Sequence, residues 1–295
     1  MSGRNETDAA ASVASQPPIG SDRIFRVTRW VAIAIVPFLL AAVFLLFVFP
    51  TRTGELFAWP IDPPMTAYLL ASAYVGGIWF FVGVAAARRW HRVKHGFPAV
   101  AVFAGALLWA TLAHLDRFSA NLSFWAWLVL YATTPFIVTS LAIAQRREDP
   151  RVPDCVDVLL PRALRWLLAV VGVSALLFGT AVFVAPAIAV DNWAWQLTPL
   201  TAQVTGAVLS LTGVVNVALL WDRRWTAFRL LFQAQSLSLA AIALSLIIRR
   251  DDLLWARPMT AIFVGLVAIA FVLYAGVVVW AGLRLRAPGP AASAR

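Results

Sequence analysis

The sequence predicts an all-α integral membrane protein, a bundle of eight transmembrane helices built as two parallel four-helix repeats. The chain has 295 residues, of which 61% are hydrophobic and only 13% are charged, with a mean hydropathy of +0.81. A soluble domain of this size would need far more surface charge. Two further observations refine the class: eight apolar runs, and two stretches about 136 residues apart that repeat the same landmarks in the same order.

Each apolar run is long enough to cross the hydrocarbon core, which takes about 20 helical residues at about 1.5 Å each. Charged side chains stand only near the ends of the runs. The runs are too long and too rich in Leu, Ala and Val for barrel strands, so helices are the structure that satisfies their backbone in lipid. The predicted spans are Thr28 to Phe49, Thr66 to Ala87, Phe97 to Leu115, Ser123 to Ala144, Ala163 to Val184, Leu200 to Trp221, Thr226 to Ile248 and Pro258 to Leu283.

The landmarks of the two stretches match in an ordered series with one deletion, which chance does not readily produce in an apolar chain. At an offset of 136, Arg29-Trp30 matches Arg165-Trp166, Phe47-Val48 matches Phe183-Val184, Pro50 matches Pro186, and Ala58-Trp59 matches Ala194-Trp195. At an offset of 135, Pro64 matches Pro199, Thr66-Ala67 matches Thr201-Ala202, Arg88-Arg89-Trp90 matches Arg223-Arg224-Trp225, and Asp116 matches Asp251. The matched landmarks therefore predict an internal duplication of the chain.

The arginines predict the orientation. Of the 24 Lys and Arg residues, 19 fall in the N-terminal arm, the second, fourth and sixth loops and the C-terminal tail. The positive-inside rule therefore places both termini in the cytoplasm. Four crossings per repeat make the repeats parallel, related by an axis along the membrane normal. The predicted organisation is a flexible arm (1–22), a first repeat (23–144), a linker (145–162), a second repeat (163–285) and a flexible tail (286–295).

The net charge of +10 is explained by this topology, with the basic residues meeting anionic lipid at cytoplasmic helix ends, and we expect no nucleic-acid partner. His91 and His95 stand among Arg88, Arg92 and Lys94, a cationic setting that opposes a metal ion. No catalytic motif or intramembrane carboxylate pair is present in the sequence. We therefore predict no metal, no cofactor and no catalytic residue, and the sequence leans away from an enzyme.

The outer ends of the second and sixth spans form the first candidate ligand site. Both open on proline, where Asp62 or Thr198 can cap free amides. With Thr66 and Thr201 one turn inside and Trp59 and Trp195 above, the two copies would frame a twin pocket for an anionic or amphipathic head group. In the alternative interpretation, the tryptophans belong to an interfacial belt and the prolines only start helices.

A second candidate is a group of amides confined to one repeat, namely Asn216, Gln233 and Gln235. Amides in hydrocarbon need hydrogen bonds, so they should face another helix or a lined pathway. A third candidate is the outer-face cluster of His114, Asp116 and Asp251, which would bind a proton or cation if the helices converge. In the alternative interpretation, these three residues simply lie at helix ends that are exposed to solvent.

Two segments carry a family resemblance. These are Phe57-Ala58-Trp59-Pro60 running into Pro63-Pro64-Met65-Thr66-Ala67, and Asp116-Arg117-Phe118 followed by Trp125 and Trp127. Here the chain resembles uncharacterised multi-pass membrane proteins of high-GC bacteria. The resemblance implies a location in the bacterial inner membrane and no particular chemistry.

The absence of charge from the middle of the spans disfavours strong coupling to protons or sodium. The sequence therefore favours a protein that handles an apolar or amphipathic small molecule or lipid, as an uncoupled permease or exporter. The competing class is a non-catalytic partner or scaffold subunit of a membrane complex, and an intramembrane enzyme is third. A polar-lined cavity joining the outer tryptophans to Gln233 would favour transport, and a sealed bundle would favour the subunit.

Overall fold

The computed structural model describes residues 20–153 and 157–286. Within them, eight helices are long and apolar enough to cross a membrane, as predicted, and the chain is a multi-pass membrane protein. The predicted flexible arm and tail fall almost entirely outside the described residues. The spanning helices are α2 (Arg26–Val48), α4 (Pro64–Ala86), α5 (Gly96–Ala113), α6 (Leu122–Ala144), α7 (Arg162–Val184), α9 (Pro199–Val217), α10 (Trp225–Ile248) and α11 (Pro258–Arg286).

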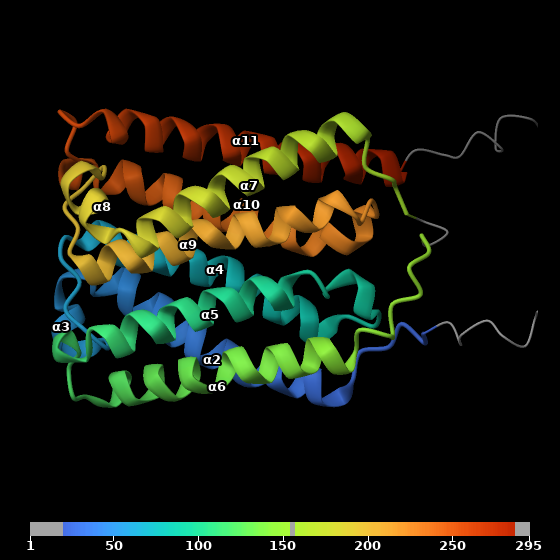
Figure 1. Cartoon of the computed structure of the whole chain (residues 1–295), viewed down its shortest axis with the longest axis horizontal. Helices are drawn as coiled ribbons and strands as arrows, with labels where there is room; N and C mark the ends of the chain where they lie inside the picture. The colour runs from blue at the N-terminus through green and yellow to red at the C-terminus, as the bar shows by residue number, and fades with distance from the viewer. Residues whose placement is uncertain (1–19, 154–156, 287–295) are drawn as a thin grey trace, which may run out of the picture.

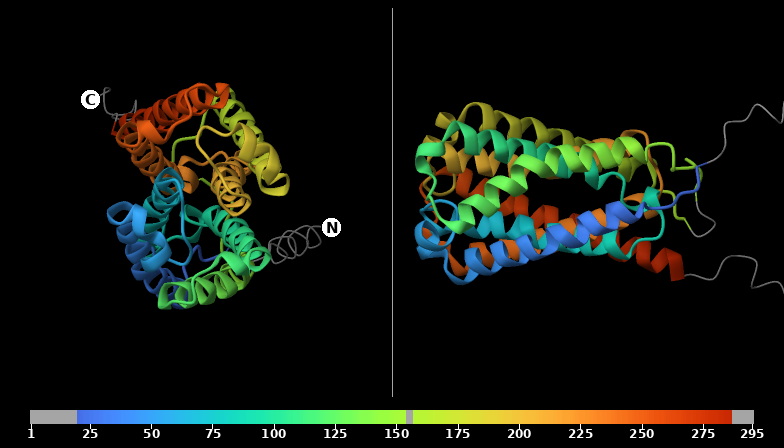
Figure 2. Two further views of the ribbon diagram at one scale, coloured as in Figure 1. Left: turned by 90° about the vertical axis from the view of Figure 1, so that its left-hand side faces the viewer. Right: turned by 90° about the horizontal axis from the view of Figure 1, so that it is seen from below.

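The helices of the N-terminal half and those of the C-terminal half form two separate groups (Figure 2), and each half contains four of the spanning helices. In the first half, α2 packs on α4 and α5 on α6, while in the second half α7 packs on α9 and α10 on α11. The halves meet where α4 packs on α10 and α5 on α9. The described chain begins and ends at one end of the bundle, here called the terminal end (Figure 1). The short helices α3 (Thr53–Leu56) and α8 (Pro186–Asn192) mark the opposite, distal end.

Backbone hydrogen bonds recur at the offsets found in the sequence. At the distal end, Ser119 N donates to Ala58 O over 2.8 Å, and Leu254 N donates to Ala194 O over the same distance. At the terminal end, an isolated antiparallel bridge joins Arg23 to Arg89, and another joins Leu159 to Arg224. These bonds link positions of the two halves that the sequence alignment pairs, while the duplication itself stays a prediction.

Proline starts both α4 and α9, as the sequence predicts. At α9 the expected cap forms: the Thr198 hydroxyl accepts from Thr201 N at 3.2 Å, and the Thr201 hydroxyl accepts from Thr198 N in return. At α4 the prediction is wrong, because the N-cap residue is Pro63 and no side chain caps the helix. Asp62 is exposed instead. The reason is register: α4 begins at Pro64, so Asp62 lies one residue too early to serve as its cap.

Glycines allow the close approach of α7 and α9. A Cβ atom at Gly206 would lie 2.6 Å from Gly179 O, and one at Gly213 would lie 2.7 Å from Gly172 O. Small residues let helix backbones approach one another in lipid, where van der Waals packing replaces the hydrophobic effect as the driving force. The equivalent positions of the first half, which include Ala71 and Ile78, carry larger side chains.

Replacing Gly206 by Ala should lower the thermal stability of the purified protein in detergent. The added Cβ would press on the α7 backbone, and overpacking of this kind costs about 1–3 kcal/mol. Gly265→Ala is the control, because a Cβ at Gly265 meets no atom within 4 Å. Equal melting temperatures for the two variants would contradict the tight α7–α9 contact.

Candidate functional site

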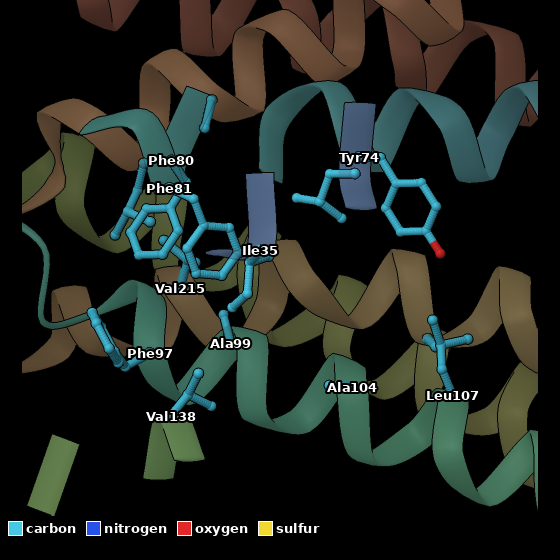
Figure 3. Packing of buried hydrophobic residues seen from close by; sticks show 14 of the residues in the cluster. Ile35, Tyr74, Phe80, Phe81, Phe97, Ala99, Ala104, Leu107, Val138 and Val215 are labelled. Carbon is cyan, nitrogen blue, oxygen red and sulfur yellow. The ribbon is translucent and has the colours of Figure 1, made fainter. Parts of the chain in front are cut away.

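A cavity of about 230 Å³ lies between the two halves of the bundle. Its wall comes from α4, α5, α9 and α10, with additions from α2, α6 and α11. Figure 3 shows part of this wall, including Ile35, Tyr74, Phe80 and Ala99. Most lining side chains are apolar, and none is Asp, Glu, Lys, Arg or His. We call this space the central cavity.

A few neutral polar groups reach the central cavity. The hydroxyls of Tyr74 and Tyr131 hydrogen-bond to each other at 2.7 Å. Gln235 also lines the cavity, and its Nε2 donates to the hydroxyl of Thr212 on α9. Ser238 lies one turn further along α10. Of the amides predicted as candidates, Gln235 is therefore the one that lines the cavity.

The other two predicted amides lie elsewhere. Asn216 is fully buried, and its Nδ2 donates to Leu168 O at 2.9 Å and to the Tyr274 hydroxyl. Its Oδ1 is buried and has no hydrogen-bond partner within residues 20–153 and 157–286. Gln233 is half-buried, and its Oε1 accepts from Trp79 Nε1 at 3.4 Å. The structure thus uses Asn216 to tie α9 to α7 and α11, and separates it from the cavity.

The predicted outer tryptophans are buried, so they do not form a surface belt. Trp195 Nε1 donates to Thr66 Oγ1 at 2.8 Å, a bond that joins the two halves. Trp59 packs edge-on against Trp127 with 4.9 Å between the ring centroids, and its Nε1 has no hydrogen-bond partner in the part of the chain that the structure describes. Neither indole lines the central cavity. Thr201, bound to Thr198 in the helix cap, does not line it either.

The outer-face acids are held apart by local pairs. Asp116 lies 3.1 Å from Arg117 with most of its side chain exposed, and Asp251 lies 3.8 Å from Arg250 and is 92% exposed. His114 Nε2 lies 3.1 Å from Gln203 Oε1, across the two halves. Among the described residues, no three His, Cys, Asp or Glu side chains come together as a metal site would require.

The terminal end holds a group of buried charges that the sequence did not reveal. We call Lys94, His95, Asp149, Asp222 and Arg224 the charge network. Arg224 donates to both carboxylates, at 2.8 Å to Asp149 and 2.7 Å to Asp222. Lys94 bridges the same two acids at 2.5 and 3.0 Å, and His95 Nε2 lies 2.9 Å from Asp222. The network joins the linker, through Asp149, to both halves.

Ion pairing outweighs burial for the carboxylates of the charge network. Burial alone raises the pKa of a carboxyl, but hydrogen bonds from His95 and Arg224 hold the pKa of Asp222 well below its ordinary range. Hydrogen bonds from Arg224 and Lys94 do the same for the pKa of Asp149. For His95 burial wins over its bond to Asp222 and lowers its pKa. The network therefore holds two anions, two cations and a neutral imidazole.

A second polar chain crosses between the halves beside the charge network. Asp22 accepts from His91 N at 2.9 Å and lies 2.6 Å from its Nδ1. Asp157 accepts from Thr226 N at 3.1 Å and from its hydroxyl at 2.8 Å. His91 Nε2 and Thr226 Oγ1 then meet at 3.1 Å. His91 and Thr226 are corresponding positions of the two halves at the offset of 135, whereas Asp157 lies one residue before Val158, the counterpart of Asp22 at the offset of 136.

His91 and His95, predicted in a cationic setting, each lie against a carboxylate as well, and both side chains are buried. The carboxylates are Asp22 of the arm and Asp222 of the sixth loop, which are distant in sequence. One signal was available: Lys94, the single lysine beside 23 arginines, stands next to His95 in a loop rich in charge.

Comparison of the chain with protein-family models, with curated proteins and with solved structures finds no match. The class is therefore defined by the fold itself: a multi-pass helical membrane protein with an apolar cavity between two groups of four helices.

The thermal stability of the protein should fall as pH decreases from 7.5 to 5.5, partly through His95. Its folded-state pKa is lowered, so the unfolded chain binds more protons in this window and acid favours unfolding. Asp149 and Asp222 should not contribute, because carboxyls with depressed pKa values lose their stabilisation only at lower pH. His95→Gln keeps a donor toward Asp222 and removes the titration.

Melting temperatures of the wild type and His95→Gln at the two pH values measure this effect. The variant should lose less stability on acidification than the wild type does. An equal or larger loss in the variant would contradict a neutral His95 in the charge network.

Proposed function

We propose that the protein binds an apolar or amphipathic small molecule or lipid in the central cavity and acts as an uncoupled permease or exporter for it. The supporting observation is the position of the cavity, in the middle of the bundle and walled by helices of both halves. Ligand sites of membrane transporters commonly lie at such a repeat interface near the bilayer midplane. The apolar wall suits a hydrocarbon ligand.

The uncoupled character follows from the lining. Proton- and sodium-coupled carriers place ionisable groups at mid-membrane depth, and no Asp, Glu, Lys, Arg or His lines the central cavity. The cavity differs from the polar-lined path that would have favoured transport most directly, because its wall is mostly apolar and Trp59, Trp195 and Gln233 do not line it. Its presence still favours ligand binding over the two competing roles. A scaffold subunit needs only a sealed bundle, and an intramembrane enzyme needs reactive groups that the lining lacks.

We further propose that the protein lies in a bacterial inner membrane with its terminal end in the cytoplasm. The Arg-rich loops gather at that end, and Arg223 there is exposed. Exposed arginines would contact anionic lipid head groups, as the positive-inside rule and the negative surface potential of the cytoplasmic leaflet require.

Filling the central cavity should displace its ligand. Ala104 lines the cavity on α5, and Ala104→Leu adds three carbon atoms there. We expect the amount of co-purifying small molecule or lipid, identified by mass spectrometry, to fall about tenfold, which corresponds to about 1.4 kcal/mol. Its passive flux into proteoliposomes should fall with it. Ala132→Leu on the exposed face of α6 is the control.

If the wild type and Ala104→Leu carry the same co-purifying molecules in the same amounts, ligand binding in the central cavity is excluded. If the flux of the bound molecule depends on a proton or sodium gradient, the uncoupled mechanism is wrong.

Cysteine labelling tests the orientation. In a Cys155→Ser background, Asp251→Cys at the distal end should react with a membrane-impermeant maleimide in intact cells. Arg223→Cys at the terminal end should react only after the cells are permeabilised. Both substituted positions are exposed, so a difference in labelling reports on membrane sidedness. The reverse pattern would place the terminal end outside.

A further inference from the structure

We infer that the ligand of the central cavity is an uncharged amphiphile, and that its head group accepts a hydrogen bond from the paired hydroxyls of Tyr74 and Tyr131. This inference rests on the proposed function, because it names the chemical class of the molecule bound at the same site. Alcohols and esters with one hydrocarbon chain belong to this class.

The lining sets the charge of the ligand. No Asp, Glu, Lys, Arg or His lines the central cavity, so a carboxylate or ammonium group inside would lack a counter-ion. An isolated charge moved from water into such surroundings is strongly disfavoured. The charges of the terminal end offer no compensation, because the charge network is already neutral and its carboxylates are saturated with donors. The lining of the central cavity therefore favours a ligand without a charge.

The tyrosine pair supplies the head-group contact. Tyr74 is 3% exposed and Tyr131 is 4% exposed, and their hydroxyl oxygens are 2.7 Å apart. Two hydroxyls hold two protons, but one hydrogen bond between them uses only one. Neither hydroxyl has another hydrogen-bond partner among the described residues, so the accepting hydroxyl keeps a proton to donate. A buried donor left unpaired is costly, and a ligand oxygen would satisfy it.

The pair stands where a ligand can reach it. Tyr74 and Tyr131 line the central cavity, and both also line a smaller space of about 90 Å³ bounded by α2, α4 and α6. On the other side of the central cavity, the Gln235 Oε1 atom and the Ser238 hydroxyl have no hydrogen-bond partner among the described residues. Polar contacts are therefore available on two sides, with apolar wall between them.

The volume sets the size of the ligand. A water-sized site takes about 10–15 Å³ of such a cavity, so about 230 Å³ accommodates on the order of fifteen to twenty non-hydrogen atoms. A medium-length alkyl chain with a small polar head has this size. We therefore choose 1-dodecanol as the probe. Dodecane serves as the apolar analogue and dodecanoate as the charged analogue of the same chain length.

The test measures binding of radiolabelled 1-dodecanol to the full chain in lipid nanodiscs, corrected for empty nanodiscs. Competition in the wild type should show dodecanol binding about tenfold more tightly than dodecane, and dodecanoate competing least. A tenfold preference corresponds to about 1.4 kcal/mol, the size expected for one hydrogen bond. Equal competition by dodecanol and dodecane would overturn the inference, as would dodecanoate competing best.

Variants then assign the preference to the tyrosine pair. Tyr74→Phe and Tyr131→Phe should each keep the preference for dodecanol over dodecane, because the remaining hydroxyl still has its proton. The double variant should lose it while staying folded, because removing both members of a hydrogen-bonded pair leaves no unpaired group. Tyr274→Phe, which removes a buried phenol bound to Asn216 outside the cavity, should keep it. A double variant that still prefers dodecanol overturns the inference.

Failure of the proposed function gives a different result. If dodecanol binds the wild type no better than Ala104→Leu, the central cavity does not bind small amphiphiles at all. If dodecane and dodecanol bind equally and Ala104→Leu abolishes both, the cavity binds hydrocarbon and the tyrosine head-group site alone is wrong.

Discussion

The whole structure depends on the absence of water in the hydrocarbon core. Every peptide group there must be paired within its own helix, and a polar side chain left without a partner is costly. The serines and threonines of the spans show this rule, since Ser72, Thr111 and Ser210 each donate to the carbonyl four residues earlier. Side chains that do not bond locally, such as Asn216 and Gln235, bond across helices instead.

The same rule concentrates the contacts between the halves at the two ends of the bundle. At the terminal end, His91 meets Thr226 and His95 meets Asp222. At the distal end, Trp195 donates to Thr66, and His114 lies against Gln203. Between these polar contacts the halves meet mainly through apolar side chains around the central cavity, with the Trp79–Gln233 hydrogen bond between α4 and α10 as a further polar contact.

The spans and the class were readable from the sequence because length and hydropathy alone decide them. Some contacts also recur at the offsets of the matched landmarks, such as the backbone hydrogen bonds of Ser119 and Leu254. The sites were harder to predict. Trp59 and Trp195 resemble interfacial residues in sequence, yet the loops fold inward and bury both rings. The charge network was missed because Asp149, Lys94 and Asp222 lie in three different loops, and only the packing of the helices brings them together.

The two ends differ in how easily they would open to the central cavity. The distal contacts between the halves are hydrogen bonds, and a typical hydrogen bond contributes about 1 kcal/mol net. At the terminal end, separating the halves would break the Lys94–Asp222 ion pair as well as the hydrogen bond between the neutral His95 and Asp222, and breaking a buried ion pair costs about 3–5 kcal/mol. The linker adds to this, because Asp149 binds Arg224 of one half and Lys94 of the other. Judged by these polar contacts, the distal end opens at a lower free-energy cost than the terminal end. A ligand of the central cavity would therefore exchange more readily with the distal side. Movement of the ligand through the terminal end would require the charge network to separate.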